Sequence, residues 1–304
     1  MRLLVTGREG QVVRALIERG AKAGHEVIAL GRPDLDLAGE KSAMVAEILT
    51  VRPDAIVSAA AYTAVDKAES EPDLAFAVNA NGPAALASAA AALNVPLLHL
   101  STDYVFDGLK DAPYVEGDLT APTGVYGASK LAGEEAIRAG CANHVILRTA
   151  WVYSQFGNNF VKTMLRLGRS RDELGVVSDQ VGNPTNALDI AAGVLAVAAN
   201  LVGNSDPARR GTFHMAGVGT ASWAVFAEEI FAASSAAGGP TARVKPITTA
   251  DYPTPARRPA NSQLDCAKIY QIHDVRLPDW SQSMREVVNQ LVQQHSLTEG
   301  PIGQ

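Results

Sequence analysis

The amino-acid sequence predicts an α/β protein whose larger part is a doubly wound parallel sheet with helices on both faces. Short apolar segments alternate with helical segments from residue 3 to residue 149, and the connections are mostly short. A glycine-rich turn follows the first apolar segment, and polar residues follow later ones where strands would end. Beyond residue 150 the alternation is less regular. We therefore expect a dinucleotide-binding domain over 1–150, joined by part of 187–216, and a smaller, discontinuous α/β substrate domain made mainly by 151–304.

Composition and charge narrow the class of protein. Of the 304 residues, 47% are hydrophobic and 19% charged, which is typical of a globular protein in water. The net charge of −6 offers no basic surface for nucleic acid. The longest apolar runs, such as 84–93, are too short to span a membrane, and the immediate first strand predicts no signal peptide. Cys141 and Cys266 lie far apart without metal-ligand spacing, so we expect a reduced, cytoplasmic protein.

The first strand, over 3–6, leads into the turn Gly7-x-x-Gly10-x-x-Val13 and an apolar helix. This order aims backbone N–H groups and a helix N-terminus at a pyrophosphate, although a tight turn without a ligand has the same pattern. The second strand, over 26–31, ends at Arg32 rather than at an acidic residue that would bind the ribose of NAD. Arg32 favours NADPH, or is simply a solvated turn residue.

The next segments are a helix over 39–50, a strand over 54–61 that ends in small residues, and a helix over 73–93. Small residues at a strand's carboxyl end let a flat cofactor approach the backbone. The strand over 95–100 then delivers Ser101, Thr102 and Asp103 to the same edge. The loop over 104–123 is longer than packing requires, which indicates a functional loop.

A helix over 124–139 carries Tyr126 and Lys130, which lie one turn apart on one face. A neighbouring cation favours the phenolate and lowers a tyrosine pKa, so such a phenol exchanges a proton with a substrate oxygen. Taken alone, the pair is equally compatible with a partly buried tyrosine and an unrelated lysine.

The remaining segments are a strand over 144–149, helices over 160–169, 187–200, 221–236 and 281–294, a strand over 212–216, and a frayed tail over 296–304. The proline-rich loop 252–259 contains Arg257 and Arg258. Two guanidinium groups on a stiff loop suit a diphosphate, and a charged surface turn is the equal alternative.

Together these segments resemble the extended short-chain dehydrogenase/reductase superfamily, with its Rossmann sheet, and within it the dTDP-4-dehydrorhamnose reductase family. The Gly-rich turn and Tyr126-x-x-x-Lys130 match the superfamily, whereas the more selective matches are residues 64–69, 101–106 and 253–259. Further matches lie at 125–134, 148–153 and 157–160. The resemblance implies that NADPH (or NADH) reduces the C4 keto group of dTDP-4-dehydro-6-deoxy-L-mannose to give dTDP-L-rhamnose.

The resemblance also implies residue roles. Tyr126 would protonate the substrate oxygen, Thr102 would bind that oxygen, and Lys130 would bind the nicotinamide ribose and lower the pKa of Tyr126. The implied cofactor contacts are Gly7, Gly10, Gln11, Val12, Arg32, Asp36, Leu37, Ala61, Tyr62, Thr63, Tyr126 and Lys130. The implied substrate contacts are Thr102, Asp103, Trp151, Asn159 and Arg258.

Departures from the family pattern argue against a metal-bridged dimer, and the residues after Thr102 argue against a dehydratase. Some members are dimers bridged by a metal on glutamates, but Ala15 and Leu188 stand at those positions, so we expect no metal and a monomer or a homodimer made otherwise. Related sugar-nucleotide dehydratases carry an Asp-Glu pair after the threonine, whereas this chain reads Thr102-Asp103-Tyr104. A non-catalytic NADP-binding regulatory subunit and a 4-ketoreductase of another dTDP-deoxysugar stay open.

Overall fold

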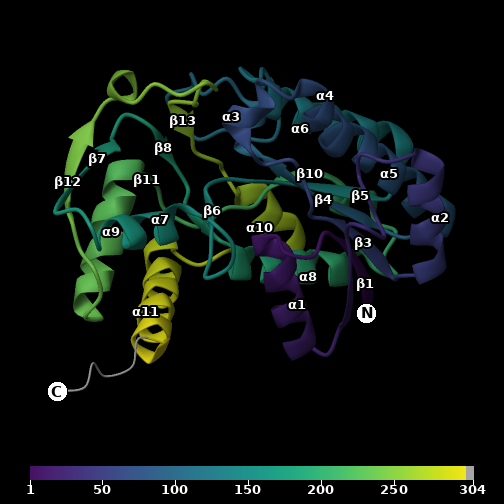
Figure 1. Cartoon of the computed structure of the whole chain (residues 1–304). Coiled ribbons are helices and arrows are strands. Elements are labelled where there is room, and N and C mark those ends of the chain that lie inside the picture. The colour runs from purple at the N-terminus through teal and green to yellow at the C-terminus, as the bar shows by residue number, and fades with distance from the viewer. Residues whose placement is uncertain (299–304) are drawn as a thin grey trace.

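The computed structural model describes residues 1–298 and centres on a six-stranded sheet in which every pair of neighbouring strands is parallel (Figure 1). The strand order is β2-β1-β3-β4-β5-β10. The strands are β1 (Arg2–Thr6), β2 (Glu26–Leu30), β3 (Ala55–Ser58), β4 (Leu97–Thr102), β5 (His144–Thr149) and β10 (Gly211–His214). The predicted parallel sheet is thus confirmed. Its order reverses between β1 and β3, where the carboxyl ends of the strands leave a crevice for a ligand.

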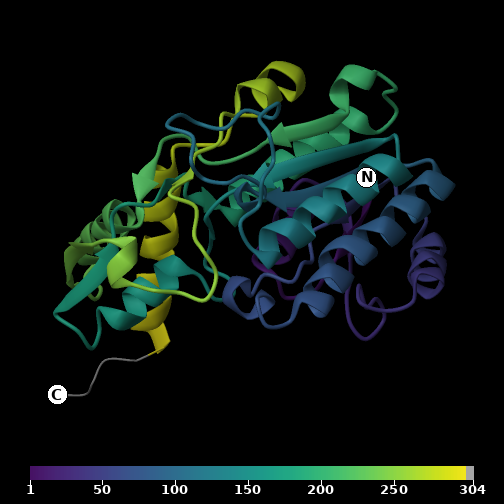
Figure 2. The ribbon, with the colours of Figure 1, turned by 90° about the horizontal axis from the view of Figure 1, so that it is seen from above.

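Helices cover both faces of this sheet. One face is covered by α1 (Gln11–Lys22) and α8 (Ala187–Leu201), and the other by α2 (Lys41–Val51), α5 (Gly82–Leu93) and α6 (Val125–Gly140). Figure 2 looks onto the face of α2, α5 and α6. Each layer has its own apolar core, because alternate residues of a strand point to opposite faces: Leu3 packs toward α1 and α8, and Leu4 toward α2 and α5.

The prediction of a single regular helix over 73–93 is wrong in one detail. The structure has α4 (Pro72–Phe76), a π-helical turn (Ala77–Asn81) and then α5. The wider turn carries the buried Asn79, whose amide accepts from Tyr62 N at 2.8 Å and donates to Ser129 Oγ at 3.0 Å. A buried amide needs such partners, and they account for the interruption of the regular helix.

A second group of elements packs beside the carboxyl edge of the sheet. Its core lies among α7 (Phe160–Leu167), α9 (Trp223–Ala236) and α11 (Trp280–Thr298), with β7 (Glu173–Val177) paired in parallel to β12 (Arg243–Ile247). The short elements are α3 (Val65–Ala68), β6 (Val152–Tyr153), β8 (Val181–Gly182), β9 (Thr185–Asn186), β11 (Ala221–Ser222), β13 (Asn261–Ser262) and α10 (Ala267–His273). We did not predict β7 and β12, whose alternation is too short to stand out.

The C-terminal end differs from the expected tail. Helix α11 continues to Thr298, so residues 296–298 are helical, and the rest of the expected tail lies outside the described residues. Within the described part of the chain, none of the helices has the length and apolar character needed to cross a bilayer.

Candidate active site

Helix α6 carries Tyr126 and Lys130 and is fixed at its N-terminus by a residue of the 64–69 segment. Glu69 Oε1 accepts a hydrogen bond from Val125 N at 2.9 Å. A carboxylate there accepts from an otherwise unpaired N–H group, and its negative charge interacts favourably with the positive end of the helix dipole. A Cβ on Gly124 would lie only 2.7 Å from that oxygen, which explains the glycine before the helix. The 64–69 segment therefore positions the helix that holds the phenol.

Tyr126 is partly buried on α6. Burial raises the pKa of its phenol, a hydrogen bond with Thr102 lowers it, and Asp103 and Tyr104 raise it further. The expected lowering by Lys130 is therefore wrong for this structure, because burial dominates and Lys130 directs its ammonium elsewhere. The ring of Tyr104 meets that of Tyr126 edge-on at 5.4 Å. A neutral phenol at this place is a proton donor at physiological pH.

Lys130 is only 2% exposed. Its Nζ donates to Leu100 O at 2.7 Å and lies 3.2 Å from His99 Nε2, so at most one of its three protons is left for a ligand. Burial lowers the pKa of Lys130 to about 8, and the charge of Glu134 opposes that shift. The ammonium is thus largely charged at neutral pH and titrates just above it.

Thr102 and Asp103 end β4 beside Tyr126. Thr102 Oγ1 donates to Asp103 Oδ1 at 2.9 Å and accepts from Tyr104 N at 3.2 Å. Burial raises the pKa of Asp103 to about 6, although hydrogen bonds from Ser262 and Thr102 partly offset it. The structure therefore brings together the three residues proposed for catalysis, Thr102, Tyr126 and Lys130, with Asp103 next to them.

A cavity of about 490 Å³ lies at the switch point, along the turn after β1. It is lined by Gly7, Arg8, Gly31, Arg32, Leu35, Asp36, Leu37, Ala38, Ala60, Ala61, Tyr62, Leu74 and Val78. Gly7 has φ +97°, and a Cβ on Gly31 would lie 3.2 Å from the Gly7 backbone, so glycine is required on both sides. Backbone at one wall, two arginines and an apolar floor suit an adenosine phosphate. Six predicted cofactor residues lie here: Gly7, Arg32, Asp36, Leu37, Ala61 and Tyr62.

The other predicted cofactor residues lie nearby in the chain. Gly10 precedes α1, whose first turn holds Gln11 and Val12, and Thr63 is exposed after Tyr62. Sequence reasoning missed Arg8, which forms an ion pair with Asp34, and Asn79, which holds Tyr62 in place. The position of Arg8 inside the glycine-rich turn was the available signal; nothing local marked Asn79.

A second cavity, of about 460 Å³, lies between α7, β7 and the loop 252–259. Its lining includes Asp66, Tyr104, Trp223, Tyr252 and Arg258. Arg258 Nη2 donates to Asp66 Oδ2 at 2.6 Å, so the proline-rich loop is tied to the 64–69 segment. Tyr104 borders this cavity and its ring contacts that of Tyr126, so the ring of Tyr104 lies between the cavity and Tyr126.

Trp151 is not among the residues that line this cavity, but it contacts one of them. Its indole stacks on that of Trp223 at 3.6 Å between ring centres, and it has φ +47°, an uncommon conformation for a large residue. A Cβ on Gly182 would lie 2.6 Å from Trp151, so that glycine makes room for the indole. Sequence reasoning missed Trp223, which lines the cavity itself.

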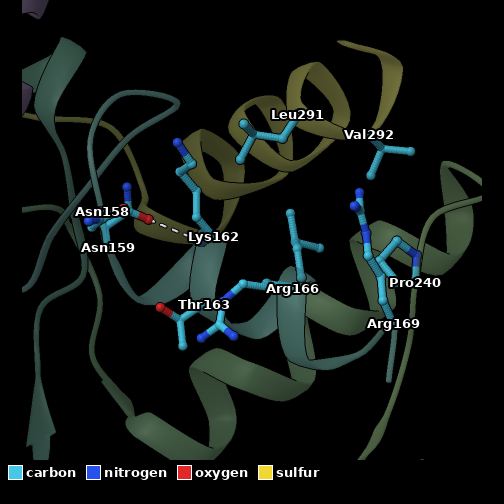
Figure 3. A pocket seen from close by; sticks show the side chains of 10 residues that line it. Asn158, Asn159, Lys162, Thr163, Arg166, Arg169, Pro240, Leu291 and Val292 are labelled. Carbon is cyan, nitrogen blue, oxygen red and sulfur yellow. Dashed lines mark hydrogen bonds between the residues drawn. The ribbon is translucent and has the colours of Figure 1, made fainter. Parts of the chain in front are cut away.

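Asn159 has a structural task. Its Oδ1 accepts from Lys162 N at 3.2 Å as the cap of α7, and its Nδ2 donates to Gln11 Oε1 at 3.0 Å. Figure 3 shows another pocket, which Asn159 lines with Lys162 and Arg166 of α7 and with Arg169 just beyond that helix. Of the predicted site residues only Asn159 lines this pocket, which shares Thr163 of α7 with the cavity beside α7.

No group of three or more His, Cys, Asp or Glu side chains within residues 1–298 is arranged to hold a metal ion. Ala15 is fully buried, and Leu188 packs against the α1–α8 core.

Comparison with known proteins gives consistent matches. The family model described as the RmlD substrate binding domain matches residues 1–293. A Sinorhizobium fredii protein named dTDP-4-dehydrorhamnose reductase is 53% identical over 288 residues, which cover 95% of this chain and 97% of that protein. The crystal structure of a dTDP-4-dehydrorhamnose reductase from Clostridium acetobutylicum superposes with a TM-score of 0.86 at 38% identity, covering 96% of this chain and 99% of that one. The Bacillus anthracis enzyme of that name, solved in complex with NADP, gives a TM-score of 0.86 at 34% identity, with 94% and 98% coverage.

Proposed function

The chain belongs to the RmlD substrate binding domain family, and from that premise we propose that it reduces the C4 keto group of dTDP-4-dehydro-6-deoxy-L-mannose to give dTDP-L-rhamnose. It is an oxidoreductase that uses NADPH or NADH. The observation that carries the proposal is the partly buried Tyr126, whose phenol adjoins Thr102 and whose ring contacts Tyr104 at the border of the cavity beside α7. Reduction of a ketone needs such a donor, because the oxygen gains a proton as the carbon gains a hydride.

The cavity at the switch point would hold the cofactor. Gly7, Gly10, Gln11 and Val12 would present backbone to the pyrophosphate at the N-terminus of α1. Asp36 and Leu37 would lie near the adenine, with Ala61, Tyr62 and Thr63 farther along the cofactor. Arg32, with Arg8, would neutralise a 2′-phosphate, which supports a preference for NADPH. When bound, the reduced nicotinamide supplies the hydride.

The residues of this chain then control the proton. Tyr126 donates its phenolic proton to the oxygen at C4, and Thr102 would turn its hydroxyl proton from Asp103 Oδ1 to the same oxygen. Lys130, whose other two ammonium protons face Leu100 O and His99, would direct its remaining proton to a ribose hydroxyl of the cofactor. Burial of Thr102 and Lys130 limits the access of water to these two groups, which strengthens their interactions.

The nucleotide sugar would occupy the cavity beside α7. Arg258 would meet the diphosphate, Asp103 and Trp151 the sugar, and Asn159 would support the wall through α7. We place the cofactor on residues 1–150 with part of 187–216, since α8 and β10 pack on the six-stranded sheet, and the substrate mainly on 151–304. We further propose a cytoplasmic protein, in keeping with two free cysteines, and a monomer or a homodimer that needs no bridging metal.

The test is a spectrophotometric NADPH and NADH oxidation assay with the 4-keto sugar nucleotide, followed by NMR of the product to fix the C4 configuration. Tyr126→Phe should lower kcat by about 10²- to 10⁴-fold, the usual contribution of a general acid, while NADPH still binds. Tyr270→Phe, at a half-exposed position, is the matched control and should leave kcat unchanged. Binding of NADPH without turnover of any 4-keto sugar would instead identify a regulatory subunit, and near-normal kcat in Tyr126→Phe would refute the acid assignment.

A further inference from the structure

His99 is a buried, ionisable residue that the reaction described above does not use. It lies in the middle of β4 with none of its surface exposed. Its Nε2 is 3.2 Å from Lys130 Nζ, and its Nδ1 is 2.9 Å from Ser58 Oγ on the neighbouring strand β3. Ser58 and His99 are direct partners in the parallel register of the two strands. The imidazole therefore links the lysine of α6 to the strand that borders the cofactor cavity.

The protonation state of His99 follows from its neighbours. Burial, then the charges of Lys130 and Arg138, hold the pKa of His99 well below its usual range, so the ring is neutral. Helix α6 contributes three charged residues near His99, namely Lys130, Glu134 and Arg138. Strand β5 contributes Arg148, which is bound to Glu134, and α5 contains no charged residue. A neutral ring that accepts from the ammonium at Nε2 carries its own proton on Nδ1, which donates to Ser58 Oγ.

We propose that His99 is a positioning residue for Lys130: its neutral imidazole accepts one ammonium proton and, with Leu100 O, aims the remaining proton at the cofactor ribose. Two fixed acceptors, at 2.7 and 3.2 Å, define the direction of an otherwise flexible side chain. The ammonium can only donate, so it fixes the tautomer in which Nε2 accepts, and Ser58 Oγ accepts the proton on Nδ1. The inference rests on the proposed function for the role of Lys130, and adds the residue that orients it.

Substitutions at residue 99 separate this role from simple packing. His99→Gln keeps an acceptor that reaches Lys130, whereas His99→Leu has a similar volume without one. Removing a hydrogen bond to a charged group should lower kcat of His99→Leu about tenfold and weaken NADPH binding by a similar factor. The alkaline limb of its kcat–pH profile should move to lower pH, since an acceptor stabilises the charged form of Lys130. His99→Gln should stay within about threefold of the parent in kcat and NADPH affinity, and keep its alkaline limb.

Thermal unfolding of each variant, and the dissociation constant of NADPH from fluorescence titration, accompany the kinetics. If His99→Leu unfolds early, the folded His99→Gln and Ser58→Ala variants decide the question, and Ser58→Ala should show a smaller shift of the alkaline limb in the same direction. A folded His99→Leu with parental kcat, affinity and pH profile would overturn the proposal, as would a folded His99→Gln that loses kcat and NADPH affinity about tenfold. Should the parent chain bind NADPH without reducing the keto sugar, the proposed function fails, while the affinities still test whether His99 orients Lys130.

Discussion

Among the residues near the active site, Glu134 is the one whose replacement should lower the free energy of unfolding most. Its carboxylate is fully buried on α6, one turn after Lys130. It accepts from Arg148 Nε at 2.9 Å and Nη2 at 2.7 Å, from Arg138 Nη2 at 2.6 Å and from Ser101 Oγ at 2.6 Å. Arg148 is itself 2% exposed. Glu134→Gln would leave the Arg148 guanidinium buried without a counter-charge.

The magnitude follows from that geometry. Removing one partner of a buried ion pair costs about 3–5 kcal/mol, because the remaining charge keeps its desolvation penalty. Arg138 is partly exposed, so its ion pair with Glu134 contributes little to this loss of stability. At about 2 °C per kcal/mol for a chain of this length, Tm should fall by roughly 6–10 °C. Replacing the exposed Glu135 by Gln is the matched control and should change Tm by less than about 2 °C.

The difference in stability between the parent and Glu134→Gln should also depend on pH. Burial acts to raise the pKa of Glu134, but Arg148, Ser101 and Arg138 hold it below its usual range. A depressed carboxyl pKa contributes stability above the unfolded-state value, near ~4.3, and that contribution is lost as pH falls through the folded-state value. Differential scanning fluorimetry from acid to neutral pH should therefore show the largest gap between parent and Glu134→Gln near neutrality. A gap that is absent, or that grows toward acid pH, would refute the role of the buried pair.

Three further predictions concern the cofactor and the phenol. Because the pKa of Lys130 is about 8, kcat should be constant below that value and fall as pH rises through it, and a pH–rate series with Lys130→Met should lack this limb. Arg8→Ala and Arg32→Ala should each raise KM for NADPH about tenfold and leave KM for NADH unchanged, as measured by initial rates with both cofactors. Asn79→Ala removes the buried bonds to Tyr62 and Ser129, so the free energy of unfolding should fall by about 2–3 kcal/mol in urea denaturation, with a weaker affinity for NADPH.

Local signals in the sequence were sufficient to predict the sheet and the positions of the residues proposed for catalysis, whose roles came from the family resemblance. The glycine turn, the apolar strands and the four-residue spacing of Tyr126 and Lys130 are all properties of short segments. A parallel sheet then brings the ends of its strands to one edge, so Thr102 and Asp103 could be expected beside that pair.

Residues whose role depends on a distant partner could not be predicted in this way. Glu69 caps a helix that begins at Val125, and Asn79 binds Ser129, 50 residues away. Trp223 lines the cavity beside α7 and stacks on Trp151, 72 residues earlier in the chain. The pKa of Tyr126 was misjudged for the same reason: sequence spacing shows a nearby cation, but the extent of burial depends on the packed structure.

These long-range contacts fix how α6 lies on the sheet. Successive residues of one helical face reach different strands: Lys130 contacts His99 of β4 beside β3, Glu134 binds Ser101 of β4 and Arg148 of β5, and Arg138 donates to Thr212 of β10 at 3.2 Å. A helix attached by polar groups to strands across the sheet can neither slide nor rotate without leaving a buried charge unpaired. The position of Tyr126, one turn before Lys130, is therefore set by the contacts that the rest of α6 makes with the sheet.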